Sequence, residues 1–137
     1  MKKEFQIPSS LSEVPKTSAQ VLDFLKPLKL TEGEIFDVRL CLEESLINSM
    51  KYGNALKPEI PVRLILEYTD TELKMTVEDH GEGFDTRKIA DCTKEENLLK
   101  QSGRGIYLIR QLMDKISYNA KGNCLSMVKY LGKQAKA

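Results

Sequence analysis

The sequence predicts an α+β domain that combines helices with an antiparallel sheet. Two segments with alternating apolar residues, 61–69 and 72–79, are joined by a short turn at Thr69, Asp70 and Thr71, which is typical of a hairpin. Two further segments, 116–120 and 124–131, flank a Lys-Gly-Asn turn near the C-terminus. Helical periodicity runs instead through residues 31–53. Strands joined by tight turns pair antiparallel, so these segments together predict one antiparallel sheet.

Length and composition favour one globular domain over residues 1–137. The chain is 41% hydrophobic and 30% charged, which is ordinary for a folded protein with a buried core. Its net charge of +1 disfavours direct binding to nucleic acid. No run approaches the ~20 apolar residues of a membrane span, which favours a cytoplasmic protein without a membrane partner. Cys41, Cys92 and Cys124 lack disulfide or zinc spacing and are expected to be reduced thiols.

The N-terminal part predicts a strand and a short helix. Residues 3–8 alternate as a strand does, and a loop is expected to follow as far as Pro15. Residues 17–26 carry apolar side chains at helical spacing, with Thr17 or Ser18 as the N-cap. This helix is expected to pack on the core or, alternatively, to bind a partner.

Residues 31–53 predict one long helix with a defined start. Thr31 and Glu34 have the spacing of a capping box, in which each side chain satisfies a backbone amide of the first turn. At about 100° per residue, the core-facing side chains are expected to be Ile35, Leu42, Leu46 and Met50, widened by Phe36 and Ile47. The opposite side is expected to carry Asp37, Cys41, Glu44, Asn48 and Tyr52.

Glu44 and Asn48 are four residues apart, so they lie one above the other on a single helix face. A carboxylate and a carboxamide at this spacing can hold a proton acceptor beside a hydrated cation. Exposed helix faces are normally polar, so the pair alone is better explained as part of a solvated surface and needs support from elsewhere in the chain.

Asp79 ends the predicted strand at 72–79, and two glycines follow it closely. Continuing the alternation of that strand places Asp79 on its apolar side, where a carboxylate needs a partner. Gly81 and Gly83 then remove side chains and allow unusual backbone conformations. The motif suits a planar ligand that lies against bare backbone and donates a hydrogen bond to Asp79. A turn rich in Gly and Asp is the alternative.

Residues 85–102 predict a long charged loop, of the kind that often forms a lid. Gly103 and Gly105 follow, at the entry to a helix whose inner face is expected to carry Ile106, Ile109, Leu112 and Met113. Backbone amides and the helix dipole favour an anion there, with phosphate the natural guest and Arg104 as added charge. The glycines otherwise ease a tight turn. Residues 132–137 are expected to fray.

The three motifs are more specific together than apart. If the three motifs form one pocket, each binds a different part of a Mg-nucleotide. The first motif along the chain provides the metal site and the reaction chemistry, the second binds the base, and the third binds the phosphates. No GxxxxGK[ST] motif occurs, and neither glycine pair belongs to a GxGxxG that follows a strand. P-loop and Rossmann sites are therefore excluded.

These segments resemble the N, G1 and G2 boxes of a known ATPase superfamily. The matching stretches are LEESLINSMKYGN, VEDHGEGFD and SGRGIYLIRQLMD. The superfamily contains DNA gyrase, histidine kinases and the mismatch-repair and heat-shock chaperone ATPases. More narrowly, residues 5–131 are similar to the stand-alone anti-sigma-factor serine kinases of bacteria. The resemblance implies a two-layer α/β sandwich with helices on one face of a mixed, mainly antiparallel sheet.

The resemblance also implies what Glu44 and Asn48 do. Glu44 would be the general base, and Asn48 would hold Mg²⁺ beside ATP. Three positions depart from the commonest pattern of the family. Tyr52 stands where many members have His, Arg104 where an apolar residue is usual, and Cys124 where relatives often carry a Thr that supports the adenine-binding aspartate.

The remaining roles implied by the resemblance concern the nucleotide. Asp79 would recognise the adenine amino group, Gly81 and Gly83 would frame the base, and Gly103 and Gly105 would serve the phosphates. The implied reaction is phosphorylation of a serine or threonine on an anti-anti-sigma protein of the STAS type, combined with capture of a sigma factor. Many relatives are homodimers. The alternative is a regulator that binds partners under nucleotide control and transfers no phosphate.

Overall fold

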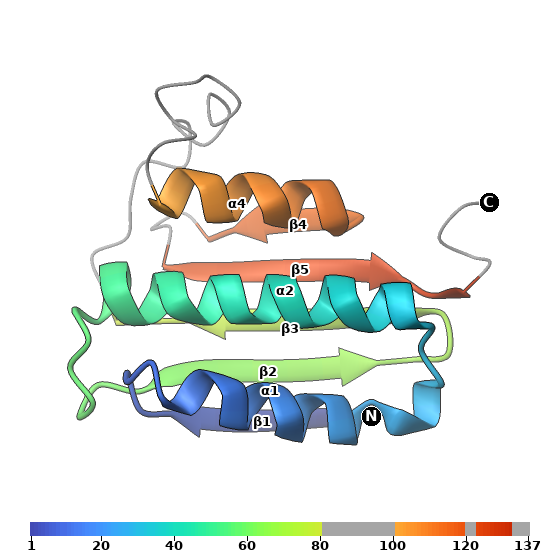
Figure 1. The fold of residues 1–137 in the computed structure, drawn as a ribbon, viewed down its shortest axis with the longest axis horizontal. Coiled ribbons are helices and arrows are strands. Elements are labelled where there is room, and N and C mark those ends of the chain that lie inside the picture. Colours follow the sequence, from blue (N-terminus) through green and yellow to red (C-terminus); the bar gives the residue numbers. More distant parts are fainter. Residues whose placement is uncertain (81–100, 120–122, 133–137) are drawn as a thin grey trace.

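The computed structural model describes residues 1–80, 101–119 and 123–132. Within them a sheet has the strand order β1-β2-β3-β5-β4, and its four pairings are all antiparallel (Figure 1). The bounds are β1 (Lys2–Ile7), β2 (Val62–Tyr68), β3 (Glu72–Glu78), β4 (Lys115–Tyr118) and β5 (Cys124–Tyr130). The expected α+β class is confirmed, whereas the extent of the domain stays a prediction.

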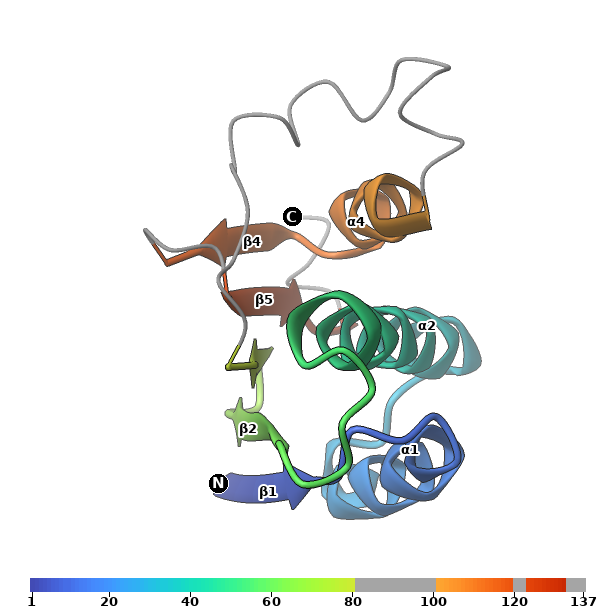
Figure 2. The same ribbon diagram turned by 90° about the vertical axis from the view of Figure 1, so that its left-hand side faces the viewer.

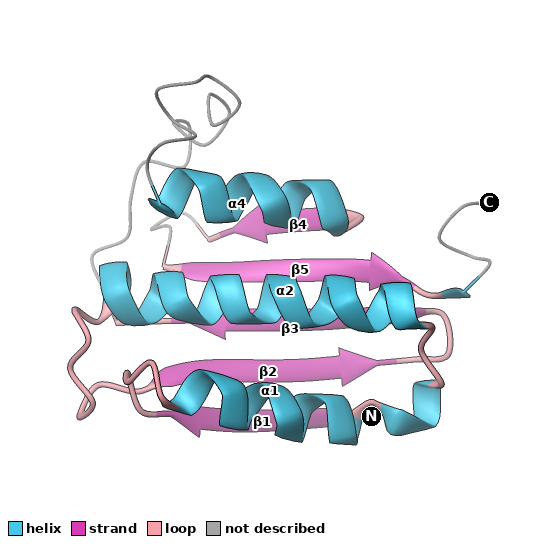
Figure 3. Cartoon of the chain, viewed as in Figure 1, coloured by secondary structure: helices cyan, strands magenta, loops and turns pink. Residues whose placement is uncertain are grey.

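The helices lie on one face of this sheet, so the fold is a two-layer sandwich (Figures 2 and 3). They are α1 (Glu13–Phe24), the short 3₁₀ helix η1 (Lys26–Leu28), α2 (Glu32–Asn48), the π-helix η2 (Ser49–Gly53) and α4 (Gln101–Leu112). α2 runs between α1 and α4 across the middle of the sheet. None of the helices in the described ranges has the length and apolar content needed to span a bilayer.

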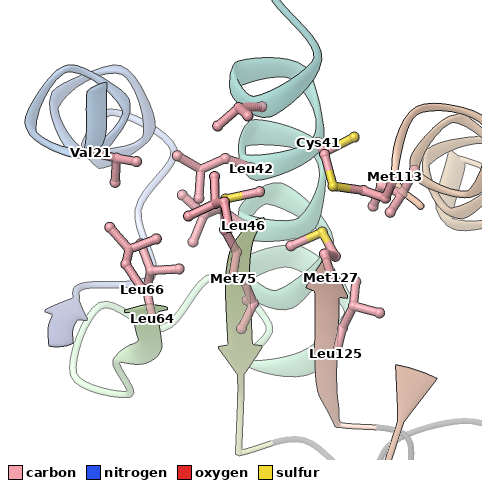
Figure 4. Close-up of a cluster of buried hydrophobic side chains, with 14 of the residues drawn as sticks. Val21, Cys41, Leu42, Leu46, Leu64, Leu66, Met75, Met113, Leu125 and Met127 are labelled. Atoms are coloured by element: carbon pink, nitrogen blue, oxygen red, sulfur yellow. The ribbon is translucent and has the colours of Figure 1, made fainter. Parts of the chain in front are cut away.

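Strand alternation sets the core. The buried side chains of the two central hairpin strands are Val62, Leu64, Leu66, Leu73, Met75 and Val77, all 1% exposed or less. β5 adds Leu125 and Met127. The strand side chains pack beneath Leu42 and Leu46 of α2, and Val21 of α1 lies on the side of Leu64 and Leu66 (Figure 4). Burying one such side chain stabilises the fold by about 1.5–3 kcal/mol. Alternating strands on the sheet side and α2 on the helix side therefore define the core.

The capping box at the start of α2 is confirmed. Thr31 Oγ1 accepts a hydrogen bond from the backbone N–H of Glu34 at 3.1 Å. The backbone N–H of Thr31 donates to Glu34 Oε1 at 2.9 Å. The second carboxylate oxygen of Glu34 accepts from the N–H of Gly132 at 2.8 Å, which ties the chain after β5 to α2. The cap therefore fixes both the helix start and the segment that follows the sheet.

The buried face of α2 differs from the expected one at its edges. Ile35 and Phe36 are 37% and 61% exposed, whereas Cys41 is 1% exposed. Cys41 lies on the side of α2 that faces Met113, immediately after α4 (Figure 4). Because α4 packs along this side, the buried strip is wider there than a single stripe predicts. Burial, followed by the nearby Asp37 carboxylate, raises the pKa of the Cys41 thiol to about 12.

α1 begins earlier than expected. The helix starts at Glu13 and contains Pro15 in its first turn, where the missing N–H of proline has no intrahelical partner to lose. Thr17 and Ser18 are 4% and 3% exposed inside the helix, so neither is its N-cap. The prediction of a loop as far as Pro15 was wrong for this reason.

A buried lysine joins α2, α4 and the sheet. Lys129 lies on the helix-facing side of β5 and is 8% exposed. Its Nζ donates to Asp37 Oδ2 at 3.1 Å and to the carbonyl oxygen of Leu112 at 3.4 Å. The carbonyl belongs to the C-terminal residue of α4, where the helix dipole favours a cation. Lys129 thus holds the far end of α4 against α2.

Asp37→Ala is expected to lower the free energy of unfolding by about 2–3 kcal/mol, because it leaves a buried ammonium without its counter-ion. Lys129→Met removes the more deeply buried charge and leaves Asp37, whose side chain is 26% exposed and open to water, so a smaller loss of about 1 kcal/mol is expected. Asp23→Ala is the control, since the Asp23–Lys26 pair is more than 70% exposed on both sides. Urea unfolding measures all three. Equal losses of unfolding free energy for Asp37→Ala and Lys129→Met would contradict the conclusion that Lys129 is a buried charge that depends on Asp37.

Candidate functional site

Three elements bring the predicted motifs to one edge of the molecule. The C-terminal end of α2, the end of β3 and the N-terminal end of α4 all lie at the left of Figure 1. α4 runs antiparallel to α2, because Gly105 lies near Asn48 while the Leu112 carbonyl lies near Lys129 and Asp37. The contacts of Lys129 with Asp37 and Leu112 therefore lie at one end of the α2–α4 interface, and the candidate site lies at the other end.

Glu44 and Asn48 both contact the backbone of α4 at Gly105. A Cβ added to Gly105 would lie 2.8 Å from Asn48 Nδ2 and 3.1 Å from Glu44 Oε2. The Nδ2 atom of Asn48 is buried and has no hydrogen-bond partner among the described residues. A buried amide without a partner is unfavourable unless a ligand completes it. Glu44 and Asn48 thus share a face, as predicted, and that face is an inner one.

The helix changes its hydrogen bonding directly after Asn48. Residues Ser49–Gly53 form the π-helix η2, in which the N–H of Asn54 donates to the carbonyl of Ser49 at 2.9 Å. π-helical turns are rare and are often found at functional sites. The wider turn lies between Asn48 and Gly53, and both of these residues contact other parts of the candidate site. Periodicity at 100° per residue carries no signal for such a turn.

Asp79 lies on the helix-facing side of the sheet, as the strand phase predicts, and is 9% exposed. Its carboxyl group lies against Gly53, where an added Cβ would overlap all three carboxyl atoms. The backbone N–H of Asp79 donates to the carbonyl of Asn123 at 2.9 Å. Asn123 Nδ2 donates in turn to the carbonyl of Asp79 at 2.9 Å. Glycine at position 53 is therefore required by the position of the Asp79 carboxylate.

Cys124 is the first residue of β5. It lies opposite Glu78 in the β3–β5 ladder, which places its side chain on the face of the sheet away from the helices. Burial, followed by the neighbouring Glu78 carboxylate, raises the pKa of its thiol. The polar side chain that reaches the Asp79 backbone is that of Asn123, one residue earlier.

Other predicted site residues are only partly described. Gly81, Gly83 and residues 85–100 lie outside the described residues, as do residues 133–137. α4 begins at Gln101, so Gly103 and Arg104 lie inside its first turn rather than before it. Tyr52, at the family's His position, is 54% exposed.

The side chains at the candidate site suit a metal ion that is bound mainly by the phosphates of a nucleotide and by few protein atoms. No group of three or more His, Cys, Asp or Glu side chains is placed to hold a metal in the part of the chain that the structure describes. Mg²⁺ is commonly held by one or two protein oxygens together with phosphate oxygens and water. Asn48 is the candidate for such a ligand, but its Nδ2 rather than its Oδ1 lies beside Gly105, so its carboxamide would have to turn over to present the oxygen to a metal.

Comparison with known proteins gives matches over almost the whole chain. The chain is 27% identical to the serine-protein kinase RsbW of Staphylococcus aureus strain MRSA252, over 96% of this chain and 87% of that protein. The same kinase from strain Newman is 26% identical over the same shares. The crystal structure of the RsbU and RsbW domains of a Mycobacterium tuberculosis protein matches with a TM-score of 0.64 at 10% identity. That match covers 96% of this chain and 32% of the other, and it supports the fold alone.

The family assignment agrees with the geometry of the site. The model of the histidine kinase-like ATPase domain matches residues 7–129, a range that contains all three predicted boxes. The fold of five antiparallel strands under helices fits this assignment. Because the match extends over most of its length, the chain belongs to the histidine kinase-like ATPase domain family.

Proposed function

We propose that this protein is an ATP-dependent serine/threonine protein kinase that acts as an anti-sigma factor. The observation that carries the proposal is the packing of Glu44 and Asn48 against Gly105, at the edge where Asp79 follows β3. A proton acceptor, a metal ligand and a helix N-terminus in one place are what phosphoryl transfer requires. The similarity to serine-protein kinase RsbW over 96% of the chain supports it.

The nucleotide would bind in one orientation. Asp79 accepts a hydrogen bond from the adenine amino group, and Gly81 and Gly83 leave room for the base. The phosphates lie at the start of α4, where Gly103 and Gly105 allow close approach to backbone amides. Arg104, which stands between these two glycines in the sequence, adds a positive charge for the phosphates.

The chemistry depends on Glu44 and Asn48. Glu44 accepts the proton of a serine or threonine hydroxyl while that oxygen bonds to the γ-phosphorus and the bond from phosphorus to the ADP oxygen breaks. Asn48 holds Mg²⁺, which neutralises phosphate charge when bound. The packing of both side chains on α4 positions them before substrate arrives, which lowers the entropy cost of reaching the transition state.

The protein partners follow from the same proposal. The phosphate acceptor is a STAS-type anti-anti-sigma protein, and the captured partner is a sigma factor. Incubation of the purified protein with Mg·ATP and such a regulator is expected to add one phosphate to a serine or threonine, detected by mass spectrometry. Tight ADP binding without transfer to any partner would favour a nucleotide-switched regulator instead. Failure to bind ADP or ATP would contradict both functions.

Gly105→Ala is expected to reduce the effect of Mg²⁺ on the affinity for ADP. The new Cβ would displace the ends of the Asn48 and Glu44 side chains, both of which can rotate away, so the free energy of unfolding should change by less than about 1 kcal/mol. The gain in ADP affinity that Mg²⁺ provides is expected to fall about tenfold. Calorimetric titrations with and without Mg²⁺ measure this. An unchanged magnesium effect would show that Asn48 does not hold the ion.

A further inference from the structure

Asn54 is a buried polar residue that joins three separate segments directly after η2. It is 2% exposed. Its Nδ2 lies 3.0 Å from Ser9 Oγ and 3.1 and 3.2 Å from the carbonyl oxygens of Ile60 and Pro61. Its Oδ1 accepts a hydrogen bond from the backbone N–H of His80 at 2.9 Å. A carboxamide has two N–H donors and one carbonyl acceptor, so both ends of this side chain are engaged and its orientation is fixed.

The bond to His80 fixes one particular peptide group. The peptide between Asp79 and His80 has its N–H held by Asn54 Oδ1 and its carbonyl held by Asn123 Nδ2 at 2.9 Å. Two asparagines from different segments therefore hold the two ends of a single peptide plane. That plane sets the direction in which the Asp79 side chain leaves the backbone.

Two consecutive residues after Asn48 contact two consecutive residues after β3: Gly53 contacts Asp79, and Asn54 contacts His80. The backbone of Gly53 lies against the carboxyl group of Asp79, while the side chain of Asn54 binds the next peptide. These contacts come from the last residue of the π-helix and the residue directly after it, so a shift of Asn54 moves the backbone against which the carboxylate rests. Position and direction of the carboxylate are thus set together.

The segment after Asn54 is held in a strained conformation. Ala55 and Leu56 have φ angles of 52° and 55°, in the left-handed region that non-glycine residues rarely adopt. Strained backbone of this kind persists only where surrounding contacts hold it, and it is concentrated at binding sites. The N–H of Leu56 donates to the carbonyl of Met50 at 2.7 Å and that of Lys57 to the carbonyl of Asn54 at 3.0 Å, so this turn is tied to η2 and to Asn54.

We propose that Asn54 is a positioning residue for base recognition, acting through Asp79. The inference rests on the proposed function, in which the Asp79 carboxylate accepts the adenine amino group. Asn54 does not touch the nucleotide in this account. It sets the Asp79–His80 peptide so that the carboxylate meets an amino group, which adenine has at position 6 and guanine lacks there.

The test compares Asn54→Ala with Ser9→Ala, using ADP and GDP as probes in calorimetric titrations. Ser9→Ala removes a partner of Asn54 Nδ2 but leaves the bond from His80 to Oδ1, so it controls for general weakening of the same network. Asn54→Ala is expected to weaken ADP binding about tenfold and to reduce the preference for ADP over GDP by a similar factor. Ser9→Ala is expected to keep the preference within about twofold.

The ratio of the ADP and GDP affinities separates positioning from stability, because partial unfolding lowers both affinities equally. A wild-type ratio in Asn54→Ala would overturn the proposal. If that variant does not fold, NMR of the unsubstituted protein decides. The side-chain amide signals of Asn54 are expected to shift with ADP and less with GDP, and equal or absent shifts would overturn it. Absence of ADP binding by the unsubstituted protein would instead overturn the proposed function.

Discussion

Glu44→Gln is expected to lower the rate of phosphoryl transfer by about a hundredfold or more, which is the usual contribution of a positioned general base. The substitution keeps the size of the side chain and its packing beside Gly105 but removes the proton acceptor. Affinity for ADP is expected to stay within about threefold, since binding does not need the proton to move. Single-turnover transfer to the regulator and calorimetric titration with ADP measure the two effects separately.

Glu43→Gln is the matched control for this substitution. Glu43 is the adjacent carboxylate on α2, and its partner is Arg39 at 3.4 Å on the exposed side of the helix. Its loss is expected to change stability by less than about 1 kcal/mol and to leave the transfer rate unchanged. Equal effects of the two substitutions, or an unchanged rate in Glu44→Gln, would show that Glu44 is not the base.

Gly53→Ala is expected to weaken ADP binding about tenfold to a hundredfold, which corresponds to the loss of one charge-assisted hydrogen bond. The added methyl group would overlap the carboxyl group of Asp79, and the backbone of Asp79 is held by Asn123, so the carboxylate has to rotate away. The short side chain can rotate at a smaller cost than a backbone shift. Binding should therefore suffer more than folding.

Gly33→Ala supplies the comparison for a glycine with space. Gly33 lies in the first turns of α2, and an added Cβ there would meet only Thr31 Oγ1 at 3.9 Å. Alanine stabilises a helix relative to glycine by up to about 1 kcal/mol, so the midpoint temperature of thermal unfolding should rise slightly while the affinity for ADP stays unchanged. Full ADP affinity in Gly53→Ala would refute the placement of the Asp79 carboxylate against Gly53.

Much of the fold could be predicted because its strands alternate cleanly. The phase of β3 correctly places Asp79 on the helix-facing side, and the Thr31–Glu34 spacing correctly gives the start of α2. Period-2 and capping patterns are local, so they survive in the folded state. The face of α2 was predicted less well at Cys41, because its burial comes from α4, an element more than fifty residues away in sequence.

The site divides in the same way. The i, i+4 spacing places Glu44 and Asn48 on one face, but only tertiary packing brings Gly105 against them. Asn54 resembles an ordinary helix stop in the sequence, and its role as a buried link to His80 depends on where β3 ends. Similarly, Asn123, just before β5, donates to the Asp79 carbonyl, and no pattern in the sequence marks that bond. Residues that act through long-range hydrogen bonds leave no periodic signal.

The most direct test of the account is a crystal structure of the protein with Mg²⁺ and a non-hydrolysable ATP analogue. One nucleotide per chain is expected, with the adenine amino group on Asp79, the phosphates at the start of α4 and the metal on Asn48. A nucleotide that binds elsewhere, or that reaches Asp79 while its phosphates lie away from Asn48 and Gly105, would contradict the account.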